Sequence, residues 1–474
     1  MRRAFVAVVL TLPVACSGET AGQRDSRDNE AAVPAAAQSE AAPTTASNTT
    51  DWPQWRGPNR DGISLETGLL RKWPKDGPKL LWNSRDVNKG NNLGRGFSSL
   101  AIANGRIYTL GDREGHRGPN DSPKVKLERG MHLVCLELAT GKELWATKLS
   151  PSWNDGPRCT PTVDGNRVYC LTPFERDGAR VGFLSCVDAA TGKLVWQKDL
   201  KKEFDGQMQS GWNYSESPTI DVDKVIVTPG GESAAMVALN KVTGDVIWKC
   251  EAPKSCGAGY ASIVTAEVGG VKQYITLMGP PLGLVGVDAY TGKFLWNYAK
   301  VTNGTAAIPT PIVQGDYVFG SSGYGTGAAL LKLVADGKGG VKAQEQYFLN
   351  GRTLENHHGG MVMIGDYIYG GHGHTDGKPF CLEWKTGKLK WGPETNPAGK
   401  ASAAVLYADG RLYFRWQNNL MGLIEATPKG YNLVSEFQLP KGTSSPGWQH
   451  PVIHDGKLYI RGNDQVLCYD VKGK

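Results

Sequence analysis

A nine-residue pattern returns five times along this chain, and it limits the fold more than any other feature of the sequence. The copies are ELATGKELW at 137–145, DAATGKLVW at 188–196, NKVTGDVIW at 240–248, DAYTGKFLW at 288–296 and EWKTGKLKW at 383–391. An acid or amide opens each copy, Thr-Gly follows, and a Trp ends it. The opening side chain can accept hydrogen bonds from backbone N–H groups, and the Gly supplies the positive φ of a bulged hairpin. Each copy therefore predicts a β-hairpin whose second strand carries a Trp.

The spacing of the copies predicts the architecture. Trp145, Trp196, Trp248 and Trp296 follow one another at intervals of about fifty residues, which is the length of a four-stranded propeller blade. A second hairpin precedes each copy, as in CTPTVDGNRVYCLT at 159–172 and HPVIHDGKLYIRG at 450–462. The two hairpins together give four antiparallel strands. The chain therefore reads as a β-propeller.

The number of inner hairpins gives the number of blades. Eight of them begin near Phe97, Cys159, Glu216, Tyr260, Ile308, Asn356, Ala401 and Trp448. The fifth and seventh blades lack the motif, and residues 329–348 and 422–437 form their outer hairpins. The eighth blade has no fourth strand of its own, and KLLWNSRD at 79–86 is predicted to supply it. We expect an all-β fold: an eight-bladed β-propeller of four-stranded antiparallel blades over 51–474, whose ring is closed by an N-terminal strand, because closure leaves no free sheet edge.

The first fifty residues have a different composition. MRRAFVAVVLTLPVAC at 1–16 has two Arg residues, a short apolar run and a small residue before Cys16, as a bacterial export signal does. Leu12–Cys16 resembles a lipobox, in which the Cys is lipidated; Pro13 departs from the usual residue, and simple cleavage is the alternative. Residues 17–50 are rich in Ala, Ser, Thr and Glu and are predicted to be a disordered tether. We therefore expect a protein of the periplasm or outer membrane, held at the membrane by a lipid on Cys16.

The cysteines divide into two groups. Cys135, Cys186, Cys381 and Cys468 occupy the same place before the motif, where other blades have Ala238 or Gly286, and this predicts a small buried side chain. Cys250–Cys256 and Cys159–Cys170 are candidate disulfides in an exported chain.

Net charge argues against one class of partner. The formal charge is +7 over 474 residues, and no basic run or aromatic ladder is present. Nucleic-acid binding is therefore not expected.

The T-G-K-x-x-W repeat resembles the quinoprotein alcohol dehydrogenase-like propellers, or pyrroloquinoline quinone (PQQ) repeats. DWPQWRGPNRDGIS at 51–64 and NHHGGMVMIGDYIYGGHGH at 356–374 resemble a bacterial exported subgroup. The resemblance implies either a dehydrogenase that holds PQQ with calcium, or a non-enzymatic scaffold like the lipoprotein of outer-membrane barrel assembly. An adjacent Cys pair, a C-x-x-C-H haem site and a calcium-ligand motif are not found in the sequence, and no catalytic residue is assigned.

Blade topology places the unusual side chains on one face. Loops leading into the first strand of a blade and loops joining its second and third strands lie on the same face of a propeller. The candidate ligand-binding residues on these loops are Arg95, Arg158, Trp212, Tyr260, Arg415, Trp416, Trp448 and His450. Arg and Trp together suit an anionic planar ligand or a protein partner.

Four histidines of the sixth blade share this face. His357 and His358 precede its first strand, and His372 and His374 follow its second. Imidazoles are ligands of Zn, Cu, Fe and Ni, so the four are a candidate metal site. The alternative is that they hydrogen-bond to backbone in Gly-rich loops or contact a ligand.

Three functions remain open from the sequence. One is a scaffold of the cell envelope that binds a protein or a small anionic ligand on this face. Another is a PQQ-dependent alcohol dehydrogenase acting on polyols or polyvinyl alcohol-like substrates. The third is a metal-dependent enzyme that uses the four His residues.

Overall fold

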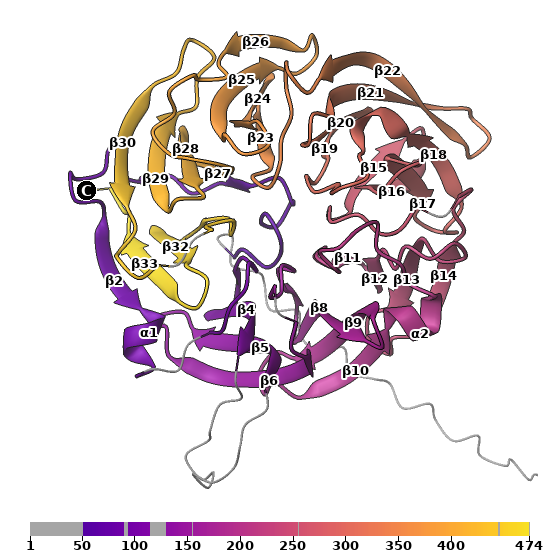
Figure 1. Cartoon of the computed structure of the whole chain (residues 1–474), viewed down its shortest axis with the longest axis horizontal. Helices are drawn as coiled ribbons and strands as arrows, with labels where there is room; N and C mark the ends of the chain where they lie inside the picture. The colour runs from indigo at the N-terminus through magenta and orange to yellow at the C-terminus, as the bar shows by residue number, and fades with distance from the viewer. Residues whose placement is uncertain are drawn as a thin grey trace, which may run out of the picture. The chain divides into compact units, whose positions relative to one another are not determined.

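The computed structural model describes residues 51–89, 93–113, 129–153, 155–254, 256–443 and 446–473. These residues form eight sheets that follow one another around a ring (Figure 1). Seven sheets have four strands, and the seventh blade gains β1 as a fifth. The described part is nearly all β, so the predicted eight-bladed propeller is confirmed.

Each blade has four antiparallel strands, and in blades one to seven these four strands follow the chain from the centre outward. Blade one consists of β3 (Ala101–Ala103), β4 (Arg106–Arg113), β5 (Gly130–Glu137) and β6 (Glu143–Pro151), and blade two of β7 (Thr162–Asp164), β8 (Arg167–Arg176), β9 (Ala179–Asp188) and β10 (Leu194–Asp199). Blade three consists of β11 (Thr219–Asp221), β12 (Lys224–Val227), β13 (Met236–Asn240) and β14 (Val246–Cys250). Blade four consists of β15 (Val264–Val268), β16 (Val271–Leu277), β17 (Leu284–Asp288) and β18 (Phe294–Tyr298).

The remaining blades complete the ring. Blade five consists of β19 (Ile312–Gln314), β20 (Tyr317–Ser322), β21 (Gly327–Ala335) and β22 (Val341–Asn350), and blade six of β23 (Met361–Ile364), β24 (Tyr367–His372), β25 (Lys378–Glu383) and β26 (Lys388–Trp391). Blade seven consists of β27 (Ala403–Ala408), β28 (Arg411–Trp416), β29 (Leu420–Glu425) and β30 (Leu433–Gln438), with β1 (Ile63–Ser64) added. Blade eight consists of β31 (Val452–His454), β32 (Lys457–Arg461) and β33 (Val466–Asp470), with β2 (Lys79–Asn83) as its outer strand. Short helices α2 (Leu200–Phe204) and η1 (Ala299–Val301) follow β10 and β18.

The ring closes as predicted, by pairing of the two ends of the propeller. Strand β2 is antiparallel to β33, and Trp82 lies opposite Cys468. The strand is shorter than the predicted 79–86, because residues Ser84–Val87 form the helix α1. The Asn83 side chain accepts the N–H of Arg85 and so caps that helix.

The repeated motif forms the predicted bulged hairpin. In the second copy the Asp188 carboxylate accepts both the N–H and the hydroxyl of Thr191, and Gly192 has φ of +74°. A Cβ on Gly192 would lie 2.7 Å from the indole of Trp145, which belongs to the preceding blade. The same contact recurs at Gly141, Gly244 and Gly292, against Trp82, Trp196 and Trp248, so the Trp of one blade packs on the glycine turn of the next.

The five tryptophans of the repeated motif, which we call the docking tryptophans, are buried to different degrees. Trp248 and Trp296 are 7% and 6% exposed. Trp145, Trp196 and Trp391 are partly buried. The indoles of Trp196, Trp248 and Trp391 also donate to backbone carbonyls of the next blade.

The cysteines behave as small core side chains. Cys135, Cys186 and Cys381 each lie directly opposite the motif Trp of their own blade, as Ala238 and Gly286 do, and all three are fully buried. The candidate disulfides Cys250–Cys256 and Cys159–Cys170 are wrong, since all four are free, buried thiols. The Cys159 sulfur accepts the N–H of Leu171 instead, and burial raises the pKa of this thiol to about 12.

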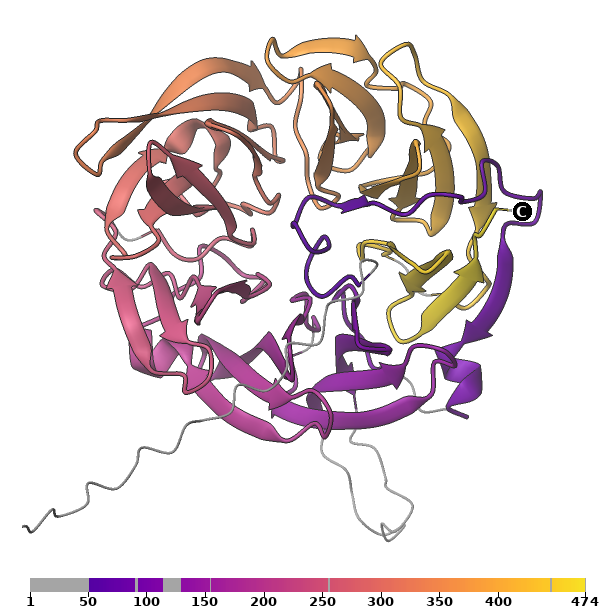
Figure 2. The same ribbon diagram turned by 180° about the vertical axis from the view of Figure 1, so that it is seen from behind.

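The segment 51–64 crosses the central channel, which the sequence did not predict (Figures 1 and 2, indigo). Trp52 pairs with Ile102 of blade one, and Arg60 donates to Ser217 of blade three. Strand β1 then runs parallel to β27 of blade seven. The segment therefore forms a plug that holds several blades from inside the ring. No helix among the described residues has the length and apolar character needed to cross a membrane.

Candidate functional site: an axial cavity above the plug

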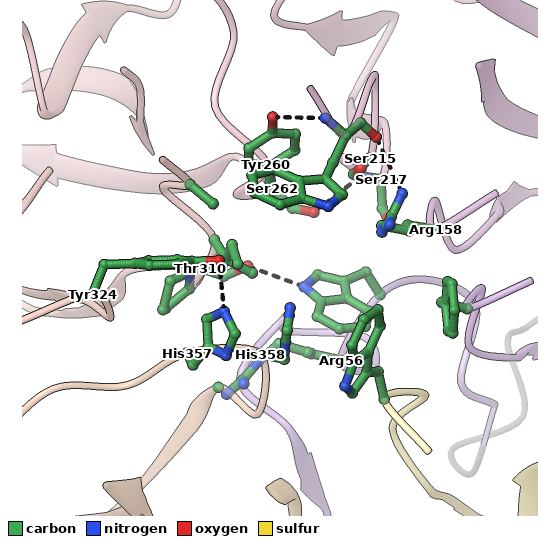
Figure 3. Close-up of a pocket in the computed structure, with 18 of the residues that line it drawn as sticks. Arg56, Arg158, Ser215, Ser217, Tyr260, Ser262, Thr310, Tyr324, His357 and His358 are labelled. Atoms are coloured by element: carbon green, nitrogen blue, oxygen red, sulfur yellow. Dashed lines mark hydrogen bonds between the residues drawn. The ribbon is translucent and has the colours of Figure 1, made fainter. Parts of the chain in front are cut away.

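A cavity of about 260 Å³ lies at the channel end where the loops lead into the first strands (Figure 3). Its aromatic lining residues are Trp55, Phe97, Trp212, Tyr260, Tyr324 and Trp448. Its basic and imidazole residues are Arg56, Arg158, His357, His358 and His374. Hydroxyl groups come from Ser215, Ser217, Ser262 and Thr310. We call this space the axial cavity.

Blade topology explains why these side chains meet. The loops into β11, β15, β19, β23 and β31 carry Trp212, Tyr260, Thr310, His357 and Trp448. His374 lies in the loop between β24 and β25. Figure 3 shows Tyr260 and Ser262 on one side of the cavity and His357, His358 and Arg56 on the other. The structure therefore brings together Arg158, Trp212, Tyr260 and Trp448 of the predicted ligand face with three of the four predicted histidines.

The plug supplies two lining residues that sequence reasoning missed. The indole of Trp55 donates to the Thr310 hydroxyl at 3.0 Å. Arg56, which is 3% exposed, donates to the carbonyls of Arg60, Asp61 and Met361. A second cavity of about 490 Å³, lined by Asn59, Arg60 and Asp61 among others, also borders Arg56. The plug therefore separates two cavities along the channel.

Three of the histidines form one cluster of tilted rings. The His357 ring centroid lies 3.6 Å from that of His358 and 4.2 Å from that of His374. Trp448 stacks on His358 at 4.3 Å, and Tyr324 lies 4.1 Å from His374. The cluster is therefore packed ring against ring.

A chain of hydrogen bonds fixes the tautomer of His357. The Ser402 hydroxyl donates to the carbonyl of His374, so its oxygen accepts from His357 Nδ1 at 3.1 Å. His357 Nε2 then accepts from the Tyr324 hydroxyl at 3.2 Å. Tyr324 has φ of +61°, a left-handed conformation unusual for a non-glycine residue.

Burial keeps two of these imidazoles, those of His357 and His358, neutral. It lowers the pKa of His357 to about 3, with His374 adding repulsion, and it lowers the pKa of His358 well below its ordinary value. Nδ1 of His358 and Nδ1 of His374 are buried and have no hydrogen-bond partner. At neutral pH His357 and His358 are therefore uncharged, and the cluster has two imidazole nitrogens without a hydrogen-bond partner.

His372 does not line the axial cavity. Its Nδ1 accepts the N–H of Glu355 at 3.2 Å, which is the backbone role that the sequence left as an alternative. Among the described residues, no three His, Cys, Asp or Glu side chains are placed to hold a metal ion. A metal shared by the four histidines thus stays a prediction without geometric support.

Four other predicted ligand residues also lie outside the axial cavity. Arg415 is fully buried and donates to the carbonyls of Gln449 and Arg461. Trp416 is fully buried, and its indole donates to the carbonyl of Gly377. The two side chains lie on opposite faces of β28, Arg415 toward blade eight and Trp416 toward blade six, because the strand extends through both residues.

Arg95 and His450 lie close to the cavity without lining it. Arg95 and Arg158 both pair with Asp155, at 3.7 Å in the case of Arg95. His450 is 5% exposed and packs edge-on against Trp55 at 4.5 Å, and burial lowers its pKa to about 3. Arg95 therefore shares a carboxylate with the lining residue Arg158, and His450 packs against the lining residue Trp55.

Calcium-bound PQQ does not fit this set of side chains. Calcium takes several oxygen ligands, chiefly carboxylates and amides. The axial cavity has no Asp, Glu, Asn or Gln in its lining. The residues that would hold the metal of a quinone cofactor are thus absent from its walls.

Comparison with known proteins gives a consistent picture. Residues 74–183 and 129–393 match the family model described as outer membrane protein assembly factor BamB. The protein of that name from Shewanella oneidensis is 25% identical over 403 residues, which cover 73% of this chain and 93% of the relative.

Two solved structures show the same fold at low identity. BamB from Moraxella catarrhalis has 16% identity and a TM-score of 0.50, over 77% of this chain and 98% of that one. A quinohemoprotein alcohol dehydrogenase from Pseudomonas putida has 14% identity and a TM-score of 0.56, over 90% of this chain and 81% of that one. The fold is thus shared by an outer membrane protein assembly factor and an alcohol dehydrogenase.

Proposed function

This chain belongs to the family of the outer membrane protein assembly factor BamB, a family of PQQ-repeat propellers, and from that premise we propose that it is an exported, lipid-anchored scaffold of the cell envelope. The scaffold binds a protein partner or a small ligand through the face that carries the axial cavity. The observation behind this proposal is that side chains from separate blades and the plug converge at one end of a closed ring.

Location at the envelope is supported by the relative and by the N-terminal sequence. The relative is named for outer membrane protein assembly. Residues 1–16 read as an export signal ending in Cys16, and they lie outside the described residues. In the proposed mature protein, lipidated Cys16 and the tether 17–50 hold the propeller at the membrane.

The dehydrogenase function has less support. Its fold is shared, but the axial cavity has no carboxylate to act as a base or to hold calcium. Three imidazoles and two guanidinium groups suit hydrogen bonding to a bound molecule. Binding is therefore the function that these walls support best.

Site-specific photo-crosslinking in the producing cell tests the partner. The crosslinker replaces Trp212, which is 38% exposed at the axial cavity, or Val242, which is 59% exposed in a motif turn at the opposite end of its blade. We expect a defined crosslinked protein from position 212 only. Equal products from both positions, or a product from 242 alone, would contradict the proposed face.

The anchor is tested separately by fractionation. With Cys16→Ser, the protein should move from the membrane pellet to the soluble periplasmic fraction. Retention of the variant in the pellet would rule out the lipid as the anchor.

A further inference from the structure

The plug places a buried positive charge against the axial cavity. The Arg56 side chain reaches only carbonyl oxygens, and no carboxylate of the described residues lies within ion-pair distance of it. Its Nη1 is buried and has no hydrogen-bond partner. A buried charge is costly unless an opposite charge or a full set of hydrogen bonds compensates it. Asp61 attracts Arg56 only at longer range, so Arg56 lacks a directly paired anion.

The lining of the axial cavity contains no acidic side chain that could pair with Arg56. Besides Arg56, the lining contains Arg158 and three histidines. Arg158 is held by Asp155, which is outside the lining, and the Arg158 side chain is 16% exposed. The axial cavity therefore favours a ligand that carries its own negative charge.

The remaining walls define the body of that ligand. Trp55, Trp212, Tyr260 and Tyr324 present aromatic surface, and the volume of about 260 Å³ suits a molecule of one or two rings. Unpartnered nitrogens of His358 and His374 offer hydrogen bonds beside it. An apolar planar body with a small charged end matches this combination.

We infer that the axial cavity is a metal-free binding site for a small organic carboxylate with an aromatic body, in which Arg56 pairs with the carboxylate. The site differs in kind from a quinone–calcium site, because the anion meets a guanidinium directly. The inference rests on the part of the proposed function that places ligand binding in this cavity. It does not depend on the protein partner, so crosslinking at position 212 and ligand titration can fail independently.

Isothermal titration of the full mature chain tests the inference. The probes are indole-3-acetate and indole-3-acetamide, which share a two-ring body and differ in charge. Because hydrogen bonds to charged groups contribute about 1.5–3 kcal/mol, the acid should bind at least about tenfold tighter than the amide. The affinity should be the same in EDTA and in calcium. Equal binding of acid and amide, no binding of either, or binding only with calcium would overturn the inference.

Two arginine variants of the plug provide the matched comparison. Arg56→Met removes the guanidinium at the axial cavity and should reduce the preference for the acid to within about twofold. Arg60→Met removes an equally buried guanidinium of the same segment that lines only the second cavity, and it should keep the preference. If both variants lose it equally, Arg56 is not the anion partner.

A third variant covers the case in which Arg56→Met does not fold. Arg158→Gln changes a partly exposed side chain at the cavity and should weaken acid binding several-fold without changing amide binding. The comparison of acid with amide in the wild-type protein decides the inference without any variant.

Discussion

The outer hairpins and the axial end of the channel differ in whether their contacts repeat from blade to blade. In the outer hairpins, the same residues make the same contacts in blade after blade: a Trp packs on the glycine turn of the next blade, opposite a Cys, Ala or Gly of its own. At the axial end, each lining residue has its own contacts, such as Tyr324 on His374 or Arg56 beside Gly360. Repetition makes a rigid ring, and departures from repetition make a binding site on it.

The plug belongs to both regions. It joins blades across the channel through β1 and the pairing of Trp52 with Ile102, as a structural element does. It also carries Trp55 and Arg56 into the axial cavity. The comparison can therefore be tested by removing, in turn, the closure of the ring, a docking tryptophan, a glycine turn and a buried histidine.

Deletion of residues 51–86 should have the largest effect. It removes both the plug and β2, so blade eight loses its outer strand and the ring opens. Exposed strand edges leave the remaining blades without a closed core. We expect no single cooperative transition in calorimetry, compared with a chain that begins at residue 51. A cooperative transition near that of the control would show that the ring does not need closure.

A pair of tryptophan variants separates the two regions. Trp248→Ala should lower the free energy of unfolding by about 3–5 kcal/mol, because it removes a large buried side chain between blades. Trp212→Ala, at the axial cavity and 38% exposed, should lower it by less than about 1 kcal/mol. Urea denaturation measures both. Similar losses would mean that the cavity wall is as important to the fold as the docking contacts.

A pair of glycine variants isolates docking from backbone strain. Gly192→Ala meets both a positive φ and the Trp145 indole, whereas Gly165→Ala has φ of +56° with no atom within 4 Å of the added Cβ. Both variants strain the backbone, so the extra loss in Gly192→Ala, about 1–3 kcal/mol, reports overpacking against the tryptophan. Equal losses in urea denaturation would indicate that the indole moves aside freely.

The smallest effect concerns pH. The pKa of His450 is about 3 in the folded protein, below its unfolded value of about 6.5, so the unfolded chain binds more protons between these values. This contribution to stability is present above pH 6.5 and is lost as the pH falls, by about 2 kcal/mol at pH 5.

His450→Gln tests this pH dependence. The difference in unfolding free energy between pH 7.5 and pH 5 should be smaller in the variant than in the wild type. Glu216, whose pKa burial raises to about 7, acts in the opposite direction in both proteins, so its effect cancels in the comparison. An unchanged pH dependence would show that the pKa of His450 does not change on folding.

Blade topology predicted part of the site, and its limits are instructive. His357, Trp212 and Trp448 precede first strands, and their loops must reach the channel end whatever their exact shape. Arg415 and Trp416 were placed on the same face by the same rule, but β28 continues through them, and both side chains are buried against neighbouring blades. Residues that belong to a strand instead of a loop place their side chains on the two faces of the sheet in turn, so neither of these side chains reaches the channel end.

The sequence by itself determined the ring: the interval of the motif, the missing outer strand and the small residue opposite each Trp are local patterns, and hairpins follow from local patterns. Only the tertiary structure decided the axial cavity. Residues 51–64 were visible as a distinctive stretch, but their path through the channel depends on contacts with blades far away in sequence, such as Arg60 with Ser217 and Trp55 with Thr310. No periodicity encodes such contacts. They arise because a closed ring leaves a central channel, and the segment that fills it must supply hydrogen-bond partners for the polar groups of the channel wall.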